Sequence, residues 1–159
     1  MSEGRIPGTS EYGSVDPAPP SEETNVSILR SILLDENEKM FHRMRVVFSL
    51  RNNRSPDAVQ TLCDGFASKS ALLKHELAYV LGQMQDSLAV PKLIQILSDP
   101  TEHVMVRHEA AEALGAIGDR RARPILQSFL NDDLPEVAES CEVALDLLAL
   151  CDDADEISW

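Results

Sequence analysis

Two adjacent His-Glu pairs, His75-Glu76 and His108-Glu109, are the residues of this sequence whose types most clearly suggest chemistry. Imidazole and carboxylate groups are both ligands of transition metals. Two imidazoles with one carboxylate form the ligand set of many non-haem Fe(II) sites, because that set leaves coordination positions open for oxygen. We therefore interpret both pairs as ligands of Fe(II), with a carboxylate from Glu109 or Glu76 completing a three-ligand set.

Two other metal-site patterns do not fit the pairs. A zinc-protease site needs a second histidine four residues after the first, but Tyr79 and Glu112 occupy those positions. A ferritin-like di-iron site needs Glu-x-x-His, which is absent from the sequence. We expect Tyr79 and Glu112 to be packing or surface residues.

The histidines also have a purely structural interpretation. Either His75 or His108 alone could bond a neighbouring helix, but their recurrence as His-Glu, each after a basic residue, favours metal binding. We interpret His42 as structural and His103 as an exposed loop residue. We also interpret Cys141-Glu142 as structural, although it keeps a carboxylate beside a thiol.

An internal repeat positions the two pairs. Residues 74–86 read KHELAYVLGQMQD and residues 107–119 read RHEAAEALGAIGD, at an offset of 108 − 75 = 33 residues. The same offset relates Gly82 to Gly115 and Pro91 to Pro124. A further step in each direction reaches His42-Arg43 and Cys141-Glu142. The pattern predicts four copies, degenerate at both ends, where a terminal repeat must face water.

Each copy is predicted to form two helices joined by a short turn. Apolar residues recur at intervals of three and four, as they do on one face of a helix. Proline falls near the first turn of the first helix, and the second helix is expected to begin near His75 or His108. Glycine inside a helix costs about 1 kcal/mol relative to alanine, so the repeated Gly82 and Gly115 predict close contact between helices.

These elements predict an all-α protein, an α-solenoid of about four HEAT-like helix pairs with a 33-residue period. Equivalent helices of neighbouring pairs then lie about 8–10 Å apart. At that separation His75 and His108 can reach one metal ion from two helices. The expected domains are a disordered Pro-rich linker over 1–22, the repeat domain over 23–150 and an acidic tail over 151–159.

Charge and composition exclude several classes of function. The net charge is −13, with 27 acidic and 14 basic residues, which argues against nucleic acid as a partner and favours either a cationic partner or plain solubility. No apolar run is long enough to span a membrane and no signal peptide is evident, so we expect a cytoplasmic protein. The odd number of cysteines, 3, predicts free buried thiols.

The segments KHELAYVLGQMQD and MVRHEAAEALGAIGD resemble the paired signatures of the deoxyhypusine hydroxylase family. SVDPAPP at 14–20 and SCEVALD at 140–146 are similar to the linker between that family's halves and to the end of its C-terminal half. The resemblance implies a HEAT-repeat di-iron monooxygenase that hydroxylates the deoxyhypusine residue of a eukaryotic translation factor, completing hypusine.

By this resemblance, His75, His108 and Glu109 would bind iron, and Glu76 would contact iron or the amine of the substrate. Glu76 is thus the candidate catalytic residue. The family has four His-Glu pairs where this chain has two, which matches only the C-terminal half. The chain is therefore expected to be a fragment or isoform, one partner of a homodimer that rebuilds the two-iron site, or a silent relative.

Two other classes compete with the enzyme. The first is a non-catalytic HEAT scaffold that binds a basic protein segment, which the short length and acidic charge favour. The second is a bilin lyase, which shares similar repeats but has no need of His-Glu in two successive copies. Iron content per chain distinguishes the enzyme from the scaffold.

Overall fold

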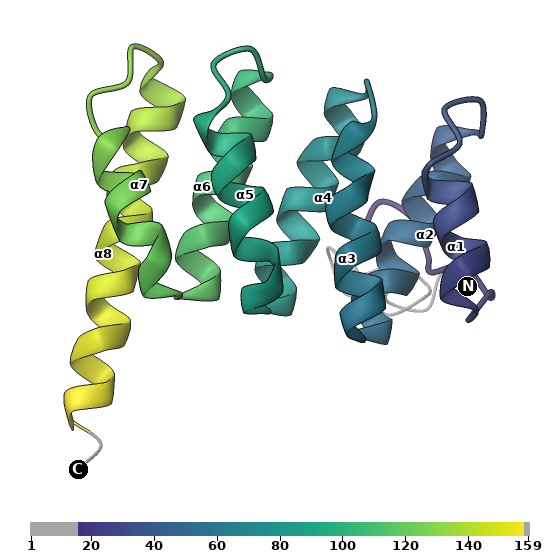
Figure 1. The fold of residues 1–159 in the computed structure, drawn as a ribbon, viewed down its shortest axis with the longest axis horizontal. Coiled ribbons are helices and arrows are strands. Elements are labelled where there is room, and N and C mark those ends of the chain that lie inside the picture. Colours follow the sequence, from purple (N-terminus) through teal and green to yellow (C-terminus); the bar gives the residue numbers. More distant parts are fainter. Residues whose placement is uncertain (1–15, 158–159) are drawn as a thin grey trace, which may run out of the picture.

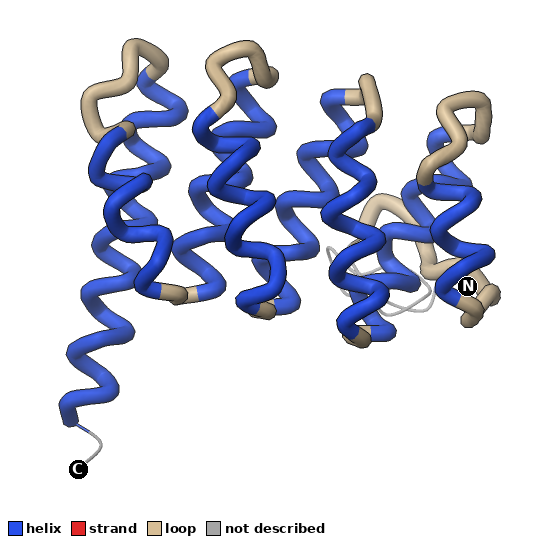
Figure 2. The backbone as a smooth tube through the Cα atoms, viewed as in Figure 1, coloured by secondary structure: helices blue, strands red, loops and turns tan. Residues whose placement is uncertain are grey.

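The computed structural model describes residues 16–157, and this part of the chain contains helices and loops but no strand (Figure 2). Three short 3-10 turns lie among its eight α-helices. The α-helices are α1 Val26–Leu33, α2 Met40–Asn53, α3 Pro56–Asp64, α4 Ala71–Met84, α5 Val90–Ser98, α6 Val104–Ile117, α7 Arg123–Ser128 and α8 Pro135–Ile157.

The helices form four antiparallel pairs that stand side by side in a row, α1–α2, α3–α4, α5–α6 and α7–α8 (Figure 1). The second helices form one layer, since α2 contacts α4, α4 contacts α6, and α6 contacts α8. Leucine, alanine and valine fill the core between this layer and the first helices. The predicted α-solenoid of four helix pairs is confirmed.

Local sequence signals set the helix ends. Ser55 caps α3, with its side chain accepting a hydrogen bond from the Ala58 backbone N–H at 3.1 Å, and Pro56 occupies the first turn. Ser70 caps α4 through the Leu73 backbone N–H in the same way. Proline also lies in the first turn of α5 and α7, where the missing N–H costs little.

The repeated glycines allow the second helices to approach closely, as predicted. A Cβ atom at Gly82 would lie 3.0 Å from the Ala113 Cα, and one at Gly115 would lie 2.9 Å from the Ala144 Cα. Both positions therefore exclude larger side chains. Gly82 brings α4 against α6, the helices that carry the two His-Glu pairs.

The repeat period differs from the prediction at both ends. Residues 54, 85 and 118, the left-handed residues that end α2, α4 and α6, are separated by 85 − 54 = 31 and 118 − 85 = 33. Leu134 precedes α8 in the same way as His103 precedes α6, because the carbonyl of each accepts the N–H groups three and four residues later. The offset between α6 and α8 is therefore 134 − 103 = 31.

The prediction that His42 and Cys141 occupy the slot of His75 and His108 is therefore wrong by two residues. Met44 and Glu139 occupy it instead. The copies differ by two residues in the length of their loops. Equivalent helix positions are therefore separated by 31 residues at the two ends of the chain and by 33 in the middle.

The predicted linker and tail are partly described. Residues 1–15 lie outside the described range, but residues 16–21 pack along α2 rather than running free. The side chain of Arg45 donates to the carbonyls of Pro19 and Pro20, and Ala18 is buried. At the other end α8 continues past residue 150 to Ile157. None of the described helices combines the length and apolar character needed to cross a bilayer.

Candidate metal centre

The two His-Glu pairs lie on neighbouring second helices. His75 is the fifth residue of α4 and His108 is the fifth residue of α6. Both helices begin four residues before their histidine, so the expectation that they start near the histidines is wrong. Each pair therefore lies in the second turn of its helix, so its backbone is fixed by helical hydrogen bonds to the first turn. All four side chains are partly buried between the helices.

One carboxylate oxygen joins the two histidines. Glu109 Oε1 lies 3.0 Å from Nε2 of His75 and 3.7 Å from Nε2 of His108. Ligand atoms bound at about 2.1 Å to one ion are about 3.0 Å apart in octahedral geometry and about 3.4 Å apart in tetrahedral geometry. The distance from Glu109 to His75 fits a shared ion, and the distance from Glu109 to His108 is slightly too long. Among the described residues, the group whose ligand atoms lie within 4.8 Å of one another is His108, Glu109 and Glu112, so His75 would have to move toward His108 for both rings to bind one ion.

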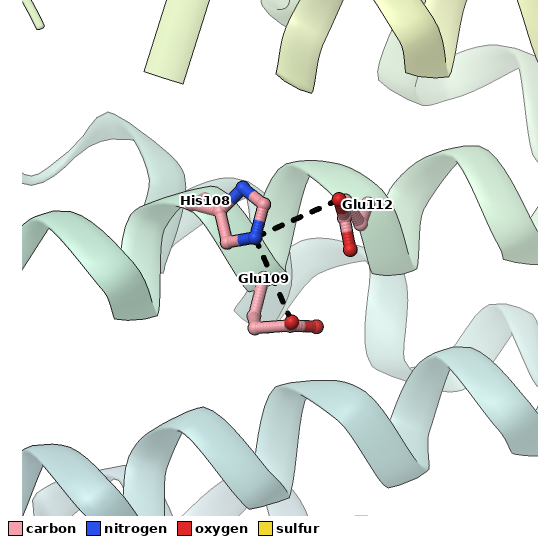
Figure 3. Close-up of side chains that lie close together, drawn as sticks. All are labelled: His108, Glu109 and Glu112. Atoms are coloured by element: carbon pink, nitrogen blue, oxygen red, sulfur yellow. Dashed lines mark ion pairs between the residues drawn. The ribbon is translucent and has the colours of Figure 1, made fainter. Parts of the chain in front are cut away.

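Glu112 extends this cluster. Its Oε1 lies 3.6 Å from Nε2 of His108, and each of His108, Glu109 and Glu112 offers a ligand atom within 4.8 Å of the others (Figure 3). Sequence reasoning placed Glu112 among packing or surface residues. The signal that could have found it is its position four residues after His108, on the same helical face. Its side chain is 48% exposed, so it lies at the open edge of the cluster.

Glu76 lies apart from the other three predicted ligands. Its Oε1 is 3.7 Å from Nδ1 of His75, whereas Glu109 faces Nε2 of the same ring. The two nitrogens of an imidazole point in diverging directions, so one ion cannot take both. At 3.7 Å the pair Glu76–His75 is an ion pair without a hydrogen bond, on the side of the ring away from Glu109.

The two carboxylates Glu109 and Glu112 lie close enough to affect each other's charge. Burial raises the pKa of the Glu109 carboxyl, whose side chain is 12% exposed, and the negative charge of Glu112 raises it further. His75 and His108 partly offset this effect. A cation between these side chains would relieve both the burial and the repulsion of the two carboxylates.

A cavity of about 550 Å³ opens beside the cluster along the groove between α4 and α6. Its walls carry Tyr79, Glu109 and Glu112, and Gly82 and Ala113 contribute to its lining. Gly82 and Ala113 let the two helices touch at the floor of this cavity, and the carboxylates of Glu109 and Glu112 make its wall negative.

The remaining histidines and the cysteines lie outside the cluster. His42 pairs with Glu38 at 2.9 Å on α2, and His103 is an exposed residue that caps α6. Cys63 and Cys141 are buried, and burial raises the pKa of each thiol to about 11, so both are unreactive. Cys151 is exposed, contrary to the prediction of buried thiols.

The comparisons with known proteins agree with this architecture. A family described as HEAT repeats matches residues 66–146, which span α4 to α8. The chain is similar to chicken (Gallus gallus) deoxyhypusine hydroxylase, with 55% identity over 91% of this chain and 48% of the relative. It is 52% identical to the Arabidopsis thaliana protein of the same name, over 87% of this chain and 45% of the relative.

A solved structure of human deoxyhypusine hydroxylase in complex with glycerol is also similar, with a TM-score of 0.85 and 48% identity. The match covers 91% of this chain and 50% of the human chain. The chain thus spans about half the length of the relatives it matches. The predicted resemblance is confirmed.

Proposed function

The chain belongs to the HEAT-repeat family and is similar along nearly its whole length to half of the deoxyhypusine hydroxylases, and from this premise we propose that it carries an iron-binding half-site for hydroxylation of deoxyhypusine. The observation that carries the proposal is the position of Glu109 Oε1 between the Nε2 atoms of His75 and His108. Two imidazoles and a carboxylate are a ligand set that non-haem iron uses, which supports the proposal.

In this proposal His75 and His108 bind iron through Nε2 and Glu109 binds it through Oε1. Bound iron would supply the activation of oxygen that hydroxylation of an unactivated carbon requires. Glu76 orients His75 or contacts the amine of the substrate, the catalytic role expected for it. Glu112, which lies on the cavity wall, attracts the cationic end of the deoxyhypusine side chain.

The substrate proposed for the groove is the deoxyhypusine residue of a eukaryotic translation factor. Its side chain is long and carries amino groups, so it requires an elongated binding groove with carboxylates along its walls. The groove between α4 and α6 offers small residues at Gly82 and Ala113 and carboxylates at Glu109 and Glu112. The excess of acidic residues, 27 against 14 basic ones, favours approach of a cationic substrate.

A complete two-iron site needs more ligands than this chain supplies. Its two His-Glu pairs account for one set of ligands, and the chain spans about half of its relatives. We propose that a second set completes the site, from a second copy of the chain in a homodimer or from a matching half. Cytoplasmic location belongs to the same proposal, since the translation factor is cytoplasmic.

Titration of the metal-free chain with Fe(II) under anaerobic conditions tests the ligand assignment. The wild-type chain is expected to bind iron, and the double variant H75A/H108A is expected to lose binding by at least about 100-fold, because two of three ligands are gone. His42→Ala is the matched control, since His42 lies on α2 and pairs with Glu38, away from the two His-Glu pairs. Equal binding by the wild-type and double-variant chains would refute the assignment.

The acidic charge also supports a second candidate function, a HEAT scaffold that binds a basic protein segment without catalysis. A scaffold of this kind would bind a lysine-rich peptide equally well with and without iron. Binding to the H75A/H108A variant therefore separates the two functions, because only the scaffold keeps its affinity.

A further inference from the structure

We propose that Ser140 is a positioning residue that fixes the tautomer and the orientation of His108, so that the Nε2 lone pair faces Glu109. Ser140 Oγ lies 2.5 Å from Nδ1 of His108, across the interface between α6 and α8. The hydrogen bond and the tautomer do not depend on a metal. The conclusion that this tautomer prepares His108 to bind a metal rests on the metal site proposed above.

The available protons determine the direction of the hydrogen bonds. Ser140 Oγ also lies 2.5 Å from the carbonyl oxygen of Glu136, one turn earlier on α8. A carbonyl oxygen can only accept, so the single hydroxyl proton of Ser140 must lie on that line. The contact with His108 is then a hydrogen bond only if Nδ1 carries a proton and donates it to Oγ.

The opposite assignment is unfavourable. If the hydroxyl donated to an unprotonated Nδ1, two oxygen lone pairs would face each other at 2.5 Å with no proton between them. A neutral imidazole has one N–H, so protonation of Nδ1 leaves Nε2 as the site with the free lone pair. That nitrogen is the one that faces Glu109 and Glu112.

Burial strengthens the constraint. Ser140 is 6% exposed, and its neighbours Val137, Cys141 and Ala144 on α8 are buried as well. Ser140 and His108 also line a cavity of about 290 Å³ between α6 and α8, and the ring of His108 has one oxygen partner on its Nδ1 side among the described residues. A hydrogen bond to the non-ligating nitrogen is the usual means by which proteins orient a histidine ligand.

Ser140 also occupies a particular place in the repeat. It stands on α8 where Glu109 stands on α6, since 140 − 109 = 31 is the offset between these two helices. Between α4 and α6 this position offers a carboxylate to Nε2 of a histidine; between α6 and α8 it offers a hydroxyl to Nδ1. Ser140 thus binds the Nδ1 side of His108, so that Nε2 of the ring is directed toward Glu109. At this position α8 offers a hydroxyl group in place of a carboxylate.

Side-chain NMR of the metal-free protein tests the tautomer directly. Long-range proton–nitrogen spectra in mildly alkaline buffer distinguish Nδ1–H from Nε2–H, and the chain has only 4 histidines to assign. The wild-type His108 is expected as Nδ1–H. Ser140→Ala should shift the ring toward Nε2–H, and Ser140→Thr should restore Nδ1–H, because threonine can make the same bond to the carbonyl four residues earlier.

The second measurement is affinity for Co(II), a probe for the iron site. Ser140→Ala should weaken binding by about 10–100-fold, and Ser140→Thr should recover most of the loss. Ser31→Ala is the matched control, because Ser31 donates to a carbonyl of its own helix but contacts no histidine. An Nε2–H tautomer in the wild-type chain, or a spectrum unchanged by Ser140→Ala, would overturn the proposal. Absence of Co(II) binding by the wild-type chain would instead refute the proposed metal site.

Discussion

At the scale of single residues, the metal site proposed above centres on Glu109. Its oxygen contacts both histidines, although it is the more buried of the two carboxylates that approach His108. Glu112 approaches the same ring from an exposed position and Glu76 approaches His75 from the opposite edge. The three carboxylates therefore differ in their positions around the rings and in their exposure, although their chemistry is the same.

Replacing Glu109 with Gln tests this ranking. Gln keeps the shape of the side chain but removes its negative charge, so Fe(II) affinity should fall by more than about 10-fold. Glu112→Gln, the matched change at the open edge, should reduce affinity by less. Calorimetric titration measures both. A larger effect at Glu112 than at Glu109 would show that Glu112, and not Glu109, is the main carboxylate ligand.

The same variant changes the pH dependence of folding in the metal-free protein. Burial raises the pKa of the Glu109 carboxyl in the folded state above its unfolded value. The stability linked to this group is therefore present below the unfolded pKa and is lost as pH rises through the folded pKa. Glu109→Gln should raise the unfolding midpoint at neutral pH, and the gain should disappear below about pH 4, as followed by circular dichroism with a chelator present.

At the scale of elements, the positions of the site residues follow from how closely the second helices pack. Gly82 and Gly115 remove the side chains that would hold α4, α6 and α8 apart. The repetition of these glycines was sufficient to predict the close contacts, because a glycine inside a helix is unfavourable unless something requires its small size. The pairs of helices were equally predictable from the apolar periodicity and the prolines.

Gly115→Ala separates packing from intrinsic helix propensity. In an isolated helix this change adds about 1 kcal/mol of stability. Here the new Cβ would lie 2.9 Å from both Cα and Cβ of Ala144, so we expect a loss of about 1–3 kcal/mol instead. Urea unfolding measures the change, and an increase in stability would mean that α6 and α8 are not held at this separation.

Other features could not be predicted because they depend on loop lengths. The 33-residue period, taken from the two strongest copies, assigned His42 and Cys141 to the repeat position of His75 and His108, although the terminal pairs are offset by 31. The same error hid Ser140, which comes into contact with His108 only in the correct register. Glu112 was missed for a different reason, since its spacing was weighed only against a zinc-protease pattern.

At the scale of the whole molecule, the helix pairs stand in a row (Figure 1), and the proposed metal site lies between α4 and α6 of the second-helix layer. A site of this kind has one covered side and one open side, which carries Glu112 and the cavity. The chain spans about half the length of the relatives it matches, and the ligands proposed here would hold one ion. A second copy facing the open side would supply the missing ligands.

Light scattering combined with iron analysis of one sample tests this arrangement. If the isolated chain has hydroxylase activity, we expect the active species to be a dimer that holds about two irons. The dimer should weaken when iron is removed with a chelator, because the shared site contributes to association. Activity from a strict monomer with one iron would show that the second set of ligands is unnecessary.

The most direct measurement of the central claim is an anomalous-difference map from crystals of the iron-loaded chain, with data collected on both sides of the iron absorption edge. The account predicts a peak between α4 and α6 at about 2.0–2.3 Å from Nε2 of His75, Nε2 of His108 and Oε1 of Glu109. A peak elsewhere, or no peak in crystals that contain iron by fluorescence, would contradict the claim that these residues form the metal site.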